Sequence, residues 1–212
     1  MKIESINVAT PIEKLHDGRK ILTGIFKSPV QGAVSVTKLN LAGDGQADLT
    51  VHGGVDKAVY AYSLDHYAYW QEMLKVQSLP YGQFGENLTI AGLDEASSCI
   101  GDQLQIGTTV FAITQPRQPC FKLGIRFDDS EMPRLFTKSA RTGFYLKVLR
   151  EGRLTAGDEV TTIERGKGEV SVKELFLAYF NPTAKESKAV YARALEVPDL
   201  SASWRTSISN RL

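Results

Sequence analysis

Residues 101–120 read GDQLQIGTTVFAITQPRQPC and contain two short apolar runs, Gln103–Ile106 and Thr109–Ile113, joined by a glycine turn. Short runs bounded by glycine and aspartate are typical of neighbouring β-strands. In the pair Gly101-Asp102, and again in Gly157-Asp158, glycine permits the turn and the aspartate bonds its own backbone, so both aspartates are interpreted as turn residues and not as ligands. The stretch predicts β-structure that ends in a proline-containing loop.

That loop combines two prolines, two basic residues and a thiol. Proline fixes φ and removes a backbone donor, so the chain is expected to leave the sheet after Ile113 and to present Cys120 beside Arg117 and Lys122. Positive neighbours favour the thiolate form of cysteine, which attacks electrophiles and binds soft metals. Most free cysteines are instead small buried hydrophobic residues. From this window alone, a nucleophile, a metal ligand and a core residue all remain open for Cys120.

The alternation of short apolar runs with glycine-rich turns extends from the N-terminus to about Arg165. It predicts a mainly β protein, a sandwich or barrel in which helices are the exception. One helix is expected after Asp65, an N-cap, to plug or flank the barrel. The expected strands are Ile3–Ala9, Lys20–Phe26, Val34–Leu39, Val59–Ser63, Asn87–Ile90, Gln103–Ile106, Thr109–Ile113, Phe144–Leu149 and Glu159–Ile163.

The last part of the chain has a helical pattern. A first helix is expected to begin after Ser171, an N-cap with Glu174 three residues on, and to end at Asn181-Pro182. Two further helical runs follow, Ala184–Leu195 and Leu200–Leu212. Helices this short are marginal alone, so they must dock on one another or on the barrel. The predicted organisation is a β-barrel domain over residues 1–165 and a small three-helix domain over residues 168–212.

The composition of the chain limits the classes of partner and the cellular compartment that we expect. The 212 residues have a formal net charge of +1, which gives no reason to expect nucleic acid or a membrane surface as a partner, and any site for a polyanion must be local. Two distant cysteines do not predict a disulfide framework. The N-terminus reads as a strand with an early acidic residue, and no segment is long and apolar enough to span a bilayer. A cytoplasmic protein in a reducing compartment is expected.

A glycine-rich window, Gly43–Tyr60, is the second candidate for chemistry. Its glycines, among them Gly53 and Gly54, allow backbone amides to approach and bind an anion. The side chains of His52, Asp56 and Lys57 would lie where this loop enters a strand. A long polar hairpin, with these side chains satisfying loop amides, is the alternative. The spacing matches neither the P-loop nor the dinucleotide-binding fingerprint.

Two shorter windows add polar groups at strand ends. Lys27 and Ser28, before a proline, could both bind phosphate, although a lysine at a strand end is usually solvated. Asn87, which follows Glu86, offers a donor and an acceptor suited to the edge of a heterocycle, and its alternative role is turn chemistry. The three histidines form no zinc pattern with the cysteines, and no serine-hydrolase elbow is present.

Taken in order, these windows resemble a MOSC-domain protein. More narrowly, they resemble the bacterial subgroup associated with resistance to 6-N-hydroxylaminopurine, in which a MOSC β-barrel is followed by a short three-helix domain. The resemblance covers nearly the whole chain. The segments that carry it are Lys27–Val30, Gly43–Asp48 continuing through His52–Val59, Phe84–Leu88, Thr114–Arg117 and Pro119-Cys120.

The resemblance implies a molybdenum cofactor (molybdopterin) held in the barrel. It assigns Cys120 as the molybdenum ligand and as the catalytic residue. A thiolate is a reasonable ligand for a metal already bound by dithiolene sulfurs. The residues that it assigns to the cofactor's phosphate and pterin are Lys27, Ser28, His52, Gly53, Gly54, Asp56, Lys57, Asn87, Thr114 and Arg117.

The reaction implied is reductive removal of oxygen from N-hydroxylated compounds such as 6-N-hydroxylaminopurine, a detoxification that gives the amine and water. Two lone cysteines cannot ligate an iron–sulfur cluster, and nothing resembles a flavin or haem site. An external, flavin-type electron-donating reductase is therefore expected as a partner. The three-helix domain, 168–212, is interpreted as the surface on which that reductase docks, or as a homodimer contact.

Two alternative functions use the same residues. The chain could carry molybdenum cofactor, or move sulfur through a persulfide on Cys120, without reducing anything. It lacks a pyridoxal-phosphate domain, so cofactor sulfurase chemistry of its own is not expected. A third hypothesis is an anion-binding structural domain in which Cys120 is buried. Because no histidine or aspartate partner is visible for a cysteine-hydrolase dyad, the sequence favours Cys120 as a molybdenum ligand.

Overall fold

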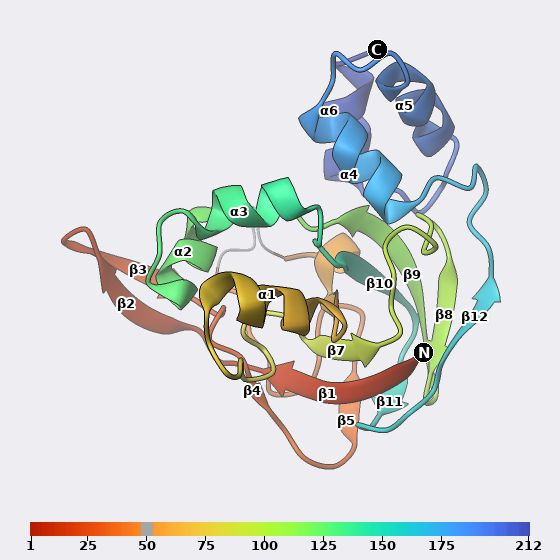
Figure 1. Cartoon of the computed structure of the whole chain (residues 1–212). Helices are drawn as coiled ribbons and strands as arrows, with labels where there is room; N and C mark the ends of the chain where they lie inside the picture. Colours follow the sequence, from red (N-terminus) through yellow and green to blue (C-terminus); the bar gives the residue numbers. More distant parts are fainter. Residues whose placement is uncertain (48–52) are drawn as a thin grey trace.

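The structure, a computed structural model, describes residues 1–47 and 53–212 (Figure 1). The strands are β1 (Lys2–Val8), β2 (Ile12–His16), β3 (Arg19–Thr23), β4 (Ser28–Pro29), β5 (Val34–Val36), β6 (Val59–Ser63), β7 (Leu88–Ala91), β8 (Gln103–Ile106), β9 (Thr109–Pro116), β10 (Phe144–Arg150), β11 (Gly152–Leu154) and β12 (Val160–Glu164). The helices are the 3₁₀ turn η1 (Val55–Lys57) and the α-helices α1 (His66–Leu74), α2 (Phe121–Phe127), α3 (Met132–Ser139), α4 (Val172–Phe180), α5 (Ser187–Leu195) and α6 (Ala202–Ser209).

The body of the protein is one curved sheet of eight strands in the order β12-β8-β9-β10-β6-β7-β1-β4. Its pairs are antiparallel except β6 and β7, which run parallel. The sheet closes on itself because Lys2, at the start of β1, bridges Glu159, and the Ile3 amide donates to the Asp158 carbonyl at 2.9 Å. Closure removes the free sheet edges at this seam, so the predicted β-barrel is confirmed.

Most predicted strands lie within a few residues of their expected bounds. Val59–Ser63 and Gln103–Ile106 have the predicted ends. β9 runs to Pro116, three residues beyond the predicted end, because β10 continues to pair with it and Phe144 lies opposite Pro116. The chain therefore leaves the sheet later than its prolines suggested.

Two helices near the loop were not predicted. α2 and α3 are only seven and eight residues long, too short for a clear periodic signal. They are stabilised by burying Leu123, Met132 and Phe136 in an aromatic cluster with Trp70 of α1. As Figure 1 shows, α1, α2 and α3 lie together beside the barrel, and the predicted helix after Asp65 flanks it.

The C-terminal helices begin and end close to their predicted positions. The Ser171 hydroxyl accepts from the Glu174 amide at 3.0 Å, as expected of an N-cap. The second and third helices are shorter than their predicted runs. Trp204 and Ile208 of α6 belong to the same buried cluster as barrel residues such as Ile100, so the helices dock on the barrel. The division at residues 165–168 stays a prediction, since this core is continuous across it.

Within residues 1–47 and 53–212, no helix combines the length and apolar character that crossing a membrane requires.

Candidate functional site

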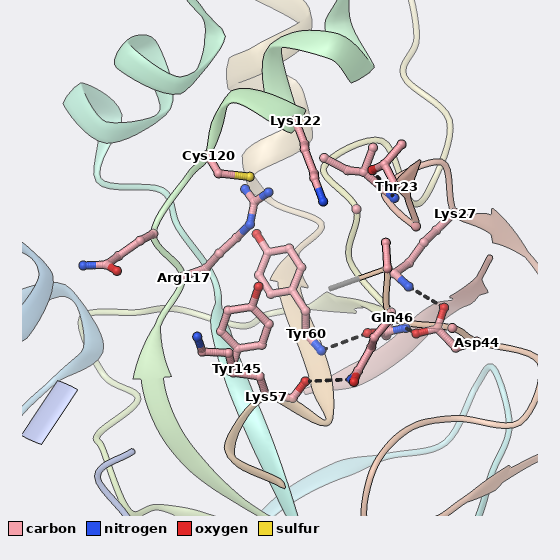
Figure 2. Close-up of a pocket in the computed structure, with 17 residues that line it drawn as sticks. Thr23, Lys27, Asp44, Gln46, Lys57, Tyr60, Arg117, Cys120, Lys122 and Tyr145 are labelled. Carbon is pink, nitrogen blue, oxygen red and sulfur yellow. Dashed lines mark hydrogen bonds and ion pairs between the residues drawn. The ribbon is translucent and has the colours of Figure 1, made fainter. Parts of the chain in front are cut away.

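A pocket opens between the base of the β2–β3 hairpin, the glycine-rich loop and the start of α2 (Figure 2). Four basic side chains and one carboxylate are among the residues that line it. Its walls therefore carry a local excess of positive charge on a chain that is nearly neutral overall. The lining residues are Thr23, Gly24, Ile25, Lys27, Asp44, Gly45, Gln46, Ala47, Lys57, Tyr60, Gly85, Asn87, Arg117, Gln118, Cys120, Lys122 and Tyr145.

Cys120 lies at the junction between the proline loop and α2. It is the N-cap of that helix, with extended backbone angles (φ −128°, ψ 171°), and its carbonyl accepts from the Leu123 amide at 2.9 Å. Its thiol is free and half-buried at the pocket wall. Figure 2 shows its sulfur beside the Arg117 guanidinium, and the Lys122 amine points into the same space. The predicted loop thus presents the thiol to a positively charged cavity.

Arg117 is the most unusual group in the pocket. Its side chain is buried between the rings of Tyr60 and Phe136, with the guanidinium carbon 5.0 Å from each ring centroid. Its Nη1 atom has no hydrogen-bond partner in the part of the chain that the structure describes. Burial lowers the pKa of Arg117, but the acidic groups of Tyr60, Tyr145 and Cys120 outweigh it and the pKa is raised. A buried cation with an unused donor is costly unless a ligand supplies the acceptor.

Lys27 and Asn87 meet at the carboxylate of Asp44. The Lys27 amine forms a buried ion pair with Asp44 Oδ1, and Asn87 Nδ2 donates to Oδ2 at 2.9 Å. The Ala9 amide also donates to Asp44 at 2.9 Å. Burial lowers the pKa of Lys27, and Asp44 opposes this shift. Most of the hydrogen-bonding capacity of Asn87 is used within the protein, since its Oδ1 accepts from the Tyr60 amide at 3.0 Å.

Glu86 organises the turn that carries Asn87. Its buried carboxylate accepts from the amides of Gly82 and Phe84, each at 3.0 Å, and from the hydroxyls of Tyr67 and Thr89. Burial raises the pKa of Glu86, and these donors oppose the shift. Glu86 does not line the pocket, so its role is to hold the turn.

Two further side chains complete the lining. Burial lowers the pKa of Lys57, and its neighbour Asp56 opposes the shift. Burial raises the pKa of Tyr145, and the Arg117 charge opposes it. Figure 2 shows the phenols of Tyr60 and Tyr145 side by side below Arg117. The Tyr60 hydroxyl donates to the Thr142 carbonyl at 2.8 Å, whereas the Tyr145 side chain hydrogen-bonds with Arg117. Arginine can only donate, so that bond leaves the Tyr145 proton available for a ligand.

The structure brings together five of the ten predicted site residues that it describes. Lys27, Lys57, Asn87, Arg117 and Cys120 line one pocket, although they come from four separate segments, with Arg117 and Cys120 in the same loop. The five predicted residues that the structure describes outside the lining are Ser28, Gly53, Gly54, Asp56 and Thr114. His52 lies outside the described residues. The cofactor-binding roles of all these residues stay predictions.

The described residues outside the lining have other contacts. Ser28 is exposed and pairs with Val8 at the sheet edge. Thr114 is fully buried and donates to the Asp56 carbonyl at 2.7 Å, and the Asp56 carboxylate accepts from the Ala202 amide at 3.1 Å. The side chains of Thr114 and Asp56 are therefore hydrogen-bonded to backbone groups of the protein.

Sequence reasoning missed Tyr60, Tyr145, Asp44 and Gln46 as lining residues. Tyr60 packs in the aromatic cluster and also lines the pocket. Tyr145 lies between buried residues of β10, and the sequence around it contains no motif that indicates a binding site. Asp44 did carry a signal: it stands between two glycines in the anion-binding window.

The pocket offers one soft ligand and several anion-binding groups. Among residues 1–47 and 53–212, no group of three or more His, Cys, Asp or Glu side chains could hold a metal ion. A single thiol holds a metal only if most of the metal's ligands come from elsewhere, as in a cofactor with its own sulfurs. The unused donor of Arg117 and the amines of Lys57 and Lys122 suit a phosphate on such a cofactor. These residues therefore fit an anionic, metal-carrying cofactor.

Comparison with known proteins places the chain in a family. The MOSC domain matches residues 48–161, and the YiiM-like 3-alpha helix domain matches residues 170–212. The protein YflK of Bacillus subtilis is 42% identical over 207 residues, covering 98% of this chain and 92% of YflK. Protein YiiM of Escherichia coli is 33% identical and covers 89% of this chain and 84% of YiiM.

Two further comparisons concern structure and length. The crystal structure of YiiM from Geobacillus stearothermophilus superposes with a TM-score of 0.83 at 35% identity, over 100% of this chain and 98% of that one. A protein of Gibberella moniliformis named "Reductase" is 32% identical over 157 residues, which are 73% of this chain but only 28% of that protein. Most of the fungal protein therefore has no counterpart here.

Proposed function

Because the chain belongs to the MOSC domain family and carries a YiiM-like three-helix domain, we propose that it binds a molybdenum cofactor in this pocket and reduces N-hydroxylated compounds. The observation that carries the proposal is the unused Nη1 donor of buried Arg117 beside the only thiol of the pocket. It supports an anionic ligand that also needs a sulfur ligand.

The proposal gives each lining group a role. Cys120 is the protein's ligand to molybdenum. Arg117, Lys57 and Lys122 bind the anionic part of the cofactor, and Lys27, neutralised by Asp44, holds the loop against it. When bound, the cofactor supplies two-electron chemistry and an open metal position.

The proposed reaction consumes two electrons and two protons. The N–O bond of a hydroxylamine, R–NHOH, breaks to give R–NH₂ and H₂O. In this proposal an external reductase supplies the electrons, because two cysteines cannot ligate an iron–sulfur cluster.

Purified protein from a host that makes the cofactor tests the proposal directly. We expect about one molybdenum per chain by metal analysis, and reduction of 6-N-hydroxylaminopurine with an artificial electron donor. Bound molybdenum without reduction would instead favour a cofactor or sulfur carrier that works through a Cys120 persulfide. The protein can also be purified free of metal and then offered the cofactor by a donor protein. If it took up no cofactor in that experiment, both the reductase and the carrier function would be contradicted.

Tyr145 is the proposed proton donor. Burial raises its pKa, so the phenol stays protonated through the neutral range, and its proton is not committed to the protein as that of Tyr60 is. Changing Tyr145→Phe should lower kcat by roughly 10²-fold, the lower end for a lost general acid, while molybdenum content stays unchanged. Steady-state kinetics measures kcat, and metal analysis measures the molybdenum content. Tyr81→Phe, which removes a phenol outside the pocket, is the matched control, and equal kcat in the two variants would exclude Tyr145.

Anion binding should weaken as pH rises. A lysine binds an anion only when protonated, and burial lowers the pKa of Lys57 from its usual 10.5, so its charge is lost at lower pH than in a free lysine. The affinity for sulfate, which does not titrate here, should fall between neutral pH and that value. Lys57→Arg should flatten the fall because arginine stays charged. Titration calorimetry measures the sulfate affinity at each pH. If the affinity fell with pH in Lys57→Arg as steeply as in the wild type, Lys57 would not contact the anion.

A further inference from the structure

The N-terminus of α6 lies against the back of the pocket wall. The Ser201 amide donates to the Thr114 carbonyl at 3.1 Å, and the Ser203 hydroxyl contacts the Gln115 amide oxygen at 3.3 Å. Both barrel residues belong to the end of β9, two to three residues before Arg117. The helical region therefore touches the segment that leads directly into the site.

A second set of contacts reaches the loop that carries Lys57. The Ala202 amide donates to the Asp56 carboxylate at 3.1 Å, and the Thr114 hydroxyl donates to the Asp56 carbonyl at 2.7 Å. Asp56 is thus held by α6 through its side chain and by β9 through its backbone. It does not line the pocket, whereas the next residue, Lys57, does.

We propose that Asp56 and Thr114 are positioning residues, through which α6 fixes the loop at residues 53–58 and so places Lys57 in the pocket. The three-helix region then acts as part of the site's frame, in addition to any docking role. The first turn of α6 contains no acidic residue of its own. Asp56 supplies the negative charge that a helix N-terminus favours, and Ser201 caps the Trp204 amide.

The described hydrogen bonds of this loop include one within its own 3₁₀ turn and one from the glycine-rich window. Within η1 the Lys57 amide bonds to the Gly54 carbonyl at 3.0 Å, and the Lys57 carbonyl accepts from Gln46 at 3.4 Å. A single 3₁₀ turn fixes few backbone angles by itself. The Thr114 hydroxyl adds a hydrogen bond from β9 of the barrel to the Asp56 carbonyl of this loop.

Point variants are required, because removing the helices would not isolate this effect. Trp204 and Ile208 are buried in one cluster with the barrel residues Ile100 and Leu104, so deleting residues 168–212 would expose the barrel core. Loss of activity in such a truncation would report unfolding as readily as loss of positioning.

The test is amide hydrogen exchange in the full chain, with Asp56→Ala and Thr114→Val. Each variant removes one hydrogen bond to the loop, so exchange of residues 53–58 should become about tenfold faster while β1 is unchanged. β10 is not used as the reference, because the Thr114 hydroxyl also contacts the Tyr145 carbonyl at 3.1 Å. The sulfate Kd should rise by a similar factor. Asp56→Asn and Thr114→Ser keep an acceptor and a donor, and should restore slow exchange. Thr206→Val, an exposed threonine of α6 that bonds within its own helix, is the matched control.

The positioning role rests on the proposed function only for the identity of the ligand. The possible outcomes therefore test the two separately. Faster exchange at residues 53–58 in a protein that never binds molybdenum would support the positioning role and contradict the cofactor. Exchange that is unchanged in both variants would overturn the positioning role, whatever the protein binds. Faster exchange throughout the barrel would also overturn it, because Thr114 would then serve general stability.

Discussion

Replacing Cys120 by alanine is expected to lower turnover of N-hydroxylated substrate by at least about 10²-fold and to reduce the molybdenum retained through purification. Loss of even an outer-shell partner of a metal ligand costs 10- to 100-fold, so loss of the protein's own ligand should cost no less. The fold should be little affected, since the side chain is half-buried and caps α2 only through its backbone. Metal analysis, the reduction assay and a thermal melt measure the three effects.

Cys99→Ala provides the matched control. Cys99 is the other free cysteine; it is buried away from the pocket, and burial raises the pKa of its thiol. Molybdenum and turnover should survive its loss. If stoichiometric molybdenum and full turnover also survived Cys120→Ala, the ligand assignment would be wrong. Cys120→Ser, which keeps a weaker oxygen ligand, should fall between the wild type and Cys120→Ala.

Replacing Arg117 by methionine is expected to separate binding from stability. The side chain is 5% exposed, between two aromatic rings, and one of its donors has no partner in the described chain. Exchanging an incompletely satisfied buried charge for an apolar side chain is often neutral or stabilising, by about 1–4 kcal/mol. The melting temperature of the cofactor-free protein should therefore hold or rise by several degrees, since each kcal/mol moves it by about 2–4 °C at this size.

Cofactor binding should move in the opposite direction. Removing one charge-assisted donor from a buried site should weaken retention of the cofactor by at least about tenfold, and Arg117→Lys should rescue part of it because it keeps the charge without the planar fork. Melts of the cofactor-free protein and molybdenum content after dialysis give the two values. A variant that melts at lower temperature and still retains its cofactor would make Arg117 a structural residue of the aromatic cluster.

Sequence reasoning reached much of the barrel and part of the site. Strands such as Val59–Ser63 follow from the local alternation of apolar residues with glycine turns, and Ser171 was predicted as a cap from its spacing to Glu174. Such signals lie within a few residues of one another. The short helices α2 and α3 were not predicted because they depend on tertiary packing against Trp70 of α1 and Phe84, which lie far from them in the sequence.

The contacts of Asp56 and Thr114 could not be predicted from the sequence. Both stand beside residues that do line the pocket, Lys57 and Arg117, so adjacency along the chain suggested a shared ligand. The Thr114 hydroxyl instead donates to the Asp56 carbonyl, and the Asp56 carboxylate accepts from the amide of Ala202 in α6, 146 residues along the chain. No spacing rule encodes a contact of that kind, because it depends on how the helices dock on the closed barrel.

The sequence by itself determined the β-barrel class, the three C-terminal helices, the MOSC resemblance and the prominence of Cys120, since alternation, caps and motif order are written locally. Only the tertiary structure decided that Lys27, Lys57, Asn87, Arg117 and Cys120 share one pocket and that Tyr145 joins them. Closure of the sheet brings their strands together, and burial then settles which charges are paired, as in Lys27 with Asp44, and which donor is left for a ligand. Burial and pairing are properties of the whole fold, so they could not be read from any one stretch of the chain.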